Sequence, residues 1–164
     1  MPEPSPFDNI SLKDIPTILP MLSQVEQEKL LAELEHLNKL KKQKKAQTKF
    51  LEFVKQMGPV FISGSHHAKM AEAFERVARG DCKRLIINMP PRHTKSEFAS
   101  YLLPAWFMGQ YPDKKVIQTS HTAELAVGFG RKVRNLVDQD AYREIFPTLS
   151  LQSDSKAAGR WNTS

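Results

Sequence analysis

Apolar residues recur at helical spacing over most of this chain. Ser23 followed by Glu26 is a capping-box signal, and Leu30, Leu34 and Leu37 then fall on one helix face, which predicts a helix from Ser23 to about Lys45. The same spacing, with cap and stop signals, predicts further helices over residues 50–57, 67–78, 95–109 (with Pro104 as a kink), 122–137 and 141–146.

Two short apolar runs, Arg84–Asn88 and Lys115–Thr119, are typical of buried strands. The order strand, helix, strand, helix from residue 84 onward predicts an α/β domain with a parallel sheet. Two strands are too few for a sheet covered on both faces, so either further strands escape the pattern or the sheet continues in residues that this chain does not contain. Residues 148–164 show no convincing element.

These patterns suggest three segments. Residues 1–20 are rich in proline and are predicted to form an irregular arm, and residues 21–58 form a helical N-terminal region. Residues 59–164 then hold the α/β part.

The net charge of +6 and the pI of about 9.5 permit an anionic partner. Five lysines gather at the end of the first helix, and they indicate either a solvated helix face or a contact with DNA or an acidic partner: Lys39, Lys41, Lys42, Lys44 and Lys45. Cys82 is the only cysteine, which fits a reducing cytoplasm. No apolar stretch is long enough to cross a membrane, and the N-terminus lacks the pattern of a secretory signal.

The segment Met89–Ser96, with the sequence MPPRHTKS, is the strongest chemical signal. A strand, a tight loop ending in Lys-Ser and a helix are the context of a phosphate-binding loop, in which backbone N–H groups cradle the phosphates. Both glycines of the usual template are replaced here, by Met89 and Thr94. The alternative interpretation is an ordinary turn between a strand and a helix.

The strings RLIINMPPRHTKSEFASYLLPAWFMGQYP and VIQTSHTAELAVGFGRKVRNLVDQDAYREIFP, with GSHHAKMAEAFERVARGDCKRL before them, resemble the large terminase subunit of tailed bacteriophages. That family is the ATP-driven motor that packages viral DNA, and its members often carry a loop written PPRHGKS or PPRHTKS. The resemblance covers about residues 46–164. It implies an incomplete P-loop NTPase, a three-layer fold with a parallel sheet, behind a helical N-terminal region.

The resemblance also implies roles for single residues. Lys95 would bind the β- and γ-phosphates of ATP, Ser96 would ligate Mg²⁺, and Arg92 would stabilise the transition state or else form a local ion pair. The loop backbone would come from Pro90, Pro91, Arg92, His93 and Thr94. Because proline has no N–H, the cradle must rest on the amides of residues 92–96. A β-branched residue at Thr94 predicts a backbone without positive φ there.

Two histidines and two arginines carry further expectations. The resemblance places His66 or His67 near the adenine, although a helix-capping histidine is an equally good interpretation. Arg131 and Arg134 share a helix face, which is either simply exposed or able to reach DNA or a neighbouring subunit's nucleotide.

The family's acidic strand, catalytic glutamate and nuclease carboxylates do not follow within this chain, so we expect it to bind ATP weakly and to hydrolyse little or none. The implied partners are double-stranded DNA, the portal, the small terminase subunit and further copies in a ring. The implied location is the cytoplasm of the infected host and, transiently, the procapsid. The alternatives are another P-loop NTPase of the helicase or recombinase type, and a non-enzymatic module that binds nucleic acid or a protein partner.

Overall fold

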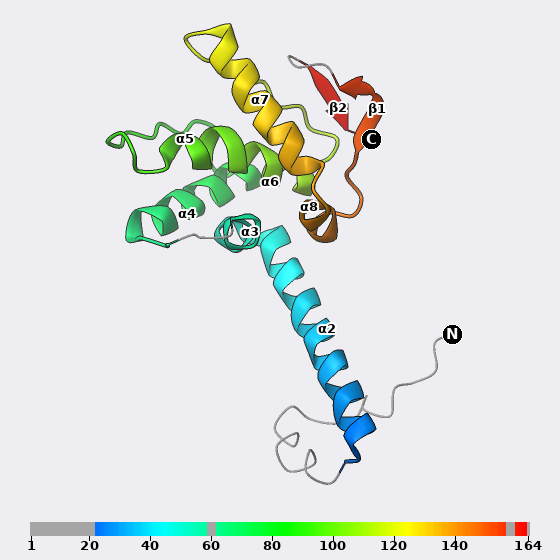
Figure 1. The fold of residues 1–164 in the computed structure, drawn as a ribbon. Helices are drawn as coiled ribbons and strands as arrows, with labels where there is room; N and C mark the ends of the chain where they lie inside the picture. The colour runs from blue at the N-terminus through cyan, green and yellow to red at the C-terminus, as the bar shows by residue number, and fades with distance from the viewer. Residues whose placement is uncertain (1–21, 59–61, 157–159, 164) are drawn as a thin grey trace. The chain divides into compact units, whose positions relative to one another are not determined.

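A computed structural model describes residues 22–58, 62–156 and 160–163 (Figure 1). The predicted arm, residues 1–20, lies outside the described residues. By its internal contacts the chain divides into two units, Met1–Lys41 and Lys42–Ser164. Helix α2 (Gln24–Thr48) begins in the first unit and ends in the second.

The start of α2 confirms the predicted capping box. The Ser23 hydroxyl oxygen accepts the N–H of Glu26 at 3.4 Å, and the Glu26 carboxylate accepts the N–H of Ser23 at 2.9 Å. The Ser23 hydroxyl also donates to that carboxylate at 2.6 Å, and these bonds lower the pKa of Glu26. On the predicted leucine face, Leu30 is buried, whereas Leu37 is half exposed.

The second unit is mostly helical, and its helices confirm the predicted ones to within a few residues (Figure 1). They are α3 (Phe50–Met57), α4 (Ser65–Arg79), the continuous run α5 (Lys95–Glu97), η2 (Phe98–Leu102) and α6 (Leu103–Gln110), then α7 (Ala123–Val137) and α8 (Asp140–Ile145). Gly80 ends α4 with a φ of 86°, in the left-handed region that glycine adopts without strain. The Thr122 hydroxyl caps α7 by accepting the N–H of Leu125.

Helix α3 supplies the centre of the hydrophobic core. The Phe50 ring makes edge-to-face contacts with Phe74, Phe98 and Trp106, at centroid distances of 5.2, 5.6 and 5.5 Å. Such pairs add about 0.5–1.5 kcal/mol each beyond the burial of their area. Phe53, on the same helix, contacts Tyr142 of α8 at 6.1 Å. One short helix therefore holds α4, α6 and α8 together.

Buried polar groups of this core are paired with backbone carbonyls. The Trp106 indole N–H donates to the carbonyl of Ala46 at 2.9 Å, and the Tyr142 hydroxyl donates to that of Ala105 at 2.7 Å. Burial raises the pKa of Tyr142, so this hydroxyl stays protonated and keeps donating.

The π-helical turn η2 explains how Pro104 fits into a continuous helix. A proline has no N–H, and its ring clashes with the carbonyl four residues earlier, here that of Ser100. The wider turn relieves that clash. The freed Ser100 carbonyl accepts the side-chain N–H of Gln118 at 2.9 Å, which ties the segment before α7 to this helix.

The predicted parallel sheet is wrong. The described residues contain one sheet, an antiparallel pair of β1 (Leu151–Lys156) and β2 (Trp161–Thr163), in a region where the sequence predicted no element. Residues 84–88 and 115–119 are not strands, and Ile86 and Ile117 are 93% and 89% exposed. The fold is therefore not the three-layer α/β architecture that the sequence predicted.

The physical reason is that a short apolar run does not make a strand without a partner. A parallel strand needs another strand to pair with, and a parallel sheet needs helices over both of its faces. Here the aromatic side chains of α3, α4, α6 and α8 pack against one another instead, and of the first run Ile87 alone contacts that core. Among the helices in the described ranges, none is long and apolar enough to cross a membrane.

Candidate phosphate-binding loop

The segment Met89–Ser96 forms a tight loop that leads directly into α5. Its backbone carries two non-glycine residues with positive φ, Arg92 at 64° and Thr94 at 58°. A left-handed conformation costs an L-residue about 1–2 kcal/mol, and it is most unusual for a β-branched one. The expectation that Thr94 avoids positive φ is therefore wrong, and contacts elsewhere must hold it there.

Side chains of the loop bond back to its own backbone. The Lys95 ammonium donates to the carbonyl oxygen of Met89 at 3.3 Å, and Nδ1 of His93 donates to the carbonyl oxygen of Pro91 at 2.9 Å. The second bond gives the His93 side chain a local role within the loop. The carbonyl of Thr94 accepts the N–H of Phe98 at 2.9 Å and so starts the helix.

The loop presents backbone donors where a helix begins. Thr94, in the left-handed conformation, is followed by helical Lys95, and such an alternation turns successive N–H groups toward one side as an anion-binding nest. Within the described ranges, no backbone carbonyl accepts from the amides of Lys95, Ser96 or Glu97. These are the donors that the first turn of every helix leaves open.

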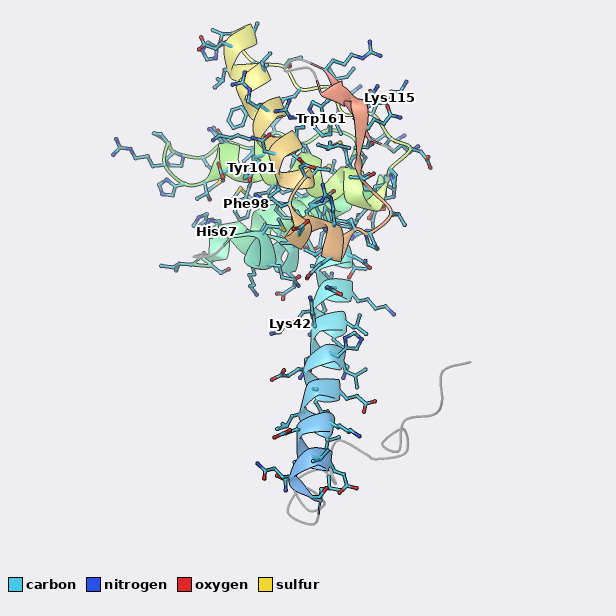
Figure 2. The ribbon with its side chains drawn as sticks, turned by 45° about the vertical axis from the view of Figure 1, so that its right-hand side comes forward. Lys42, His67, Phe98, Tyr101, Lys115 and Trp161 are labelled. Atoms are coloured by element: carbon cyan, nitrogen blue, oxygen red, sulfur yellow. The ribbon has the colours of Figure 1, made fainter. Side chains whose placement is uncertain are left out.

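His67 links this loop to helix α4. It is only 6% exposed, and its ring stacks on Phe98 with a centroid distance of 5.0 Å and an interplanar angle of 28° (Figure 2). Its Nδ1 lies 2.9 Å from the N–H of Gly64, and its Nε2 lies 2.7 Å from the Thr94 hydroxyl oxygen. The helix-capping interpretation of this histidine is confirmed, while the adenine contact stays a prediction.

Sequence reasoning missed the link between His67 and Thr94. A histidine three residues after Gly64 takes the place of the Glu or Gln of a capping box, which is a signal for the helix start alone. Nothing in the local pattern indicates that the other ring nitrogen reaches a residue 27 positions away.

The remaining predicted residues are accessible. Arg92, His93 and Ser96 are exposed, and Lys95 is half-buried. On α7, Arg131 is exposed, whereas Arg134 donates to the Asn135 side chain at 3.2 Å.

The described ranges contain no cluster of three or more His, Cys, Asp or Glu side chains that could hold a metal ion. Two hollows of the second unit, of about 540 and 680 Å³, lie away from the loop. Because Arg92, His93 and Ser96 are exposed, the loop offers its polar groups at the surface.

Comparison of the chain with models of protein families, with curated proteins and with solved structures gives no match.

Proposed function

We propose that the loop Met89–Ser96 binds the phosphates of ATP and that the chain is the N-terminal part of a viral DNA-packaging ATPase. The observation that carries the proposal is the strained backbone at Arg92 and Thr94, at the start of a helix whose first amides meet no backbone acceptor in the described ranges and which carries a lysine. Residues with strained backbone persist only where the surrounding structure holds them in place, and they are common at ligand-binding sites.

The chemistry of the loop suits a polyphosphate. The amides of residues 92–96 give directional donors, while the Lys95 ammonium and the Arg92 guanidinium give mobile positive charge. The Lys95 ammonium already lies at the loop, 3.3 Å from the Met89 carbonyl oxygen, so its positive charge is close to an anion bound there. Arg92, exposed at the turn, is the residue that we propose to stabilise charge on the transferring phosphoryl group.

The side chains present fit Mg²⁺ that arrives with ATP better than a resident metal. The Ser96 hydroxyl is exposed beside Lys95, and within the described ranges no set of carboxylates could hold the ion. Mg²⁺ commonly keeps several waters and takes its other ligands from the phosphates and one or two protein oxygens. When bound, the ion would neutralise charge on the β- and γ-phosphates.

The packaging role rests on the sequence resemblance alone. On that proposal the full motor acts on double-stranded DNA with the portal and the small terminase subunit, as a ring of copies, in the infected host and on the procapsid. On the same proposal, this chain binds the nucleotide through its loop Met89–Ser96.

Calorimetry with Mg-ATP tests the binding proposal. We expect a Kd on the order of 1 mM or tighter for the unchanged chain, and Lys95→Ala should weaken it at least about tenfold, or about 1.4 kcal/mol. Lys115→Ala removes the same charge from an exposed site on the far side of the second unit in Figure 2, and it should leave the Kd unchanged. Binding that is absent, or equally weakened by both substitutions, would remove the proposal.

A second candidate function, nucleic-acid binding without catalysis, is favoured by the lysines at the end of α2, all of which are exposed: Lys39, Lys41, Lys42, Lys44 and Lys45. If these lysines contact DNA phosphates, the affinity for duplex DNA must fall steeply with salt. The logarithm of the binding constant should fall linearly with the logarithm of the salt concentration, with a slope of about 0.9 per contact. Lys41→Gln with Lys44→Gln should reduce that slope, and Lys55→Gln should not. A slope that none of these substitutions changes would exclude this surface.

A further inference from the structure

The His67 imidazole joins two segments that are remote in sequence, the start of α4 and the loop at Thr94. Both of its ring nitrogens are engaged, by the N–H of Gly64 on one side and by the Thr94 hydroxyl on the other. Two other rings lie close to it, Phe98 at 5.0 Å and His66 at 3.8 Å between ring centroids. A side chain with these contacts is held firmly within the protein.

The direction of each hydrogen bond follows from its partners. A backbone N–H can only donate, so Nδ1 of His67 accepts from Gly64 and carries no proton. The Thr94 hydroxyl donates to the carbonyl of His93 at 2.7 Å, so its oxygen accepts from His67. The proton of the neutral ring therefore sits on Nε2, and the relay runs from Gly64 through His67 and Thr94 to His93.

This relay fits the neutral ring only. A second proton, on Nδ1, would face the Gly64 N–H, so that bond would be replaced by repulsion between two donors. Burial, and then the charge of His66, lower the pKa of His67. The titratable and charged groups on the elements around His67 are His66, on the same helix, and Arg92, His93 and Lys95, in the loop. The π-helical turn η2 contributes Phe98, which is uncharged.

We infer that His67 is the positioning residue of the phosphate-binding loop, and that the hydrogen bond donated by its Nε2 holds Thr94 in the left-handed conformation on which the amide cradle depends. The inference rests on the proposed function of the loop. It adds that phosphate binding depends on the hydrogen bond between His67 and Thr94, although this side chain is not proposed to touch the phosphates.

Two substitutions at His67 separate positioning from packing. Glutamine is a standard residue at the third position of a helix, and its amide can accept from Gly64 and donate to Thr94 without titrating. Phenylalanine keeps a ring against Phe98 but loses both hydrogen bonds. We therefore expect His67→Gln to preserve the left-handed conformation of Thr94, and His67→Phe or Thr94→Val to lose it.

NMR on the full chain without nucleotide reads out the relay directly. The nitrogen shifts of His67 should report a proton on Nε2 alone, and the coupling and chemical shifts of Thr94 should report a positive φ that disappears in His67→Phe. A positive φ retained in both His67→Phe and Thr94→Val overturns the inference, whatever the loop binds.

Binding of magnesium tripolyphosphate supplies the second readout. His67→Phe should bind about tenfold more weakly, the scale of one lost buried hydrogen bond. His67→Gln, whose amide can still donate to Thr94, should bind as tightly as the unchanged chain. If the unchanged chain binds, an equal loss in His67→Gln and His67→Phe, or no loss in either, overturns the positioning role. If Thr94 relaxes as expected while the unchanged chain binds no tripolyphosphate, the proposed function has failed and the positioning role has not.

Discussion

The ammonium group of Lys95 lies 3.3 Å from the carbonyl oxygen of Met89, six residues earlier, and the hydrogen bond between them closes the loop. The two prolines after Met89 have φ fixed near −65°, so the chain must reverse within the next few residues. Arg92 and Thr94 supply that reversal with positive φ. Closure and strain are thus two aspects of one geometry, and each can be tested by substitution.

Arg92→Gly should release strain without harming the fold. Relief of the left-handed conformation is worth about 1–2 kcal/mol, and the greater freedom of glycine in the unfolded chain offsets about 0.4–1 kcal/mol of it. The free energy of unfolding, from urea titration, should therefore stay level or rise by up to about 1.6 kcal/mol, while Mg-ATP binds more weakly.

Ala68→Gly, on an exposed position of α4, is the matched control for Arg92→Gly. It should lower the free energy of unfolding by about 1 kcal/mol, because glycine disfavours a helix interior. If Arg92→Gly is as destabilising as this control, the positive φ at Arg92 is not real strain.

Acid should destabilise the second unit through His67. Because the pKa of this histidine is lowered in the folded state, the unfolded chain binds the proton first, near pH 6.5. The stabilising contribution is therefore complete above about pH 6.5 and is lost as the pH falls toward the lower, folded pKa. Urea midpoints measured between pH 7.5 and 5 should fall more in the unchanged chain than in His67→Gln. If the urea midpoints of the two proteins fall equally over this pH range, His67 does not contribute to the loss of stability in acid.

Gly109 and Gly128 both lie in helices, yet alanine should act in opposite directions at the two sites. A Cβ at Gly109 would come within 2.5 Å of the Phe146 ring, whereas at Gly128 it meets nothing within 4 Å. Gly109→Ala should cost about 1–3 kcal/mol by overpacking, and Gly128→Ala should gain about 0.5–1 kcal/mol from helix propensity. Thermal unfolding of the two variants gives the comparison; a gain at both sites would mean that Phe146 does not pack on α6.

Ile86 provides a test of the corrected fold. At 93% exposure its truncation to alanine should change the free energy of unfolding by no more than about 0.5 kcal/mol. Ile145→Ala, at a residue 2% exposed, should cost about 2–5 kcal/mol. In a parallel sheet covered on both faces Ile86 would be buried, so a comparable loss at both positions would argue for that sheet instead.

The helices could be predicted because their signals are local. The capping box at Ser23 and Glu26, the left-handed Gly80 and the Thr122 cap each depend on residues within one turn, and the structure contains all three. Apolar spacing then placed the buried faces of α3 and α4 correctly, since Phe53 and Phe74 are both buried.

Strands depend on partners that local patterns do not specify. The run around Ile86 has the composition of a strand but lies exposed, while the mostly polar residues 151–156 pair with Trp161–Thr163 in a hairpin. The loop shows the same limitation. Its lysine and serine were recognisable, but the left-handed Thr94 was not, because the hydroxyl that helps to hold it bonds to His67, which belongs to another helix.

Titration of the uniformly ¹⁵N-labelled chain with Mg-ATP, followed by NMR, tests the central claim most directly. The account predicts that the largest amide shifts occur at residues 92–96, and that they vanish in Lys95→Ala. Amides of this loop that stay unmoved while others shift, or a spectrum that does not change at all, would contradict it.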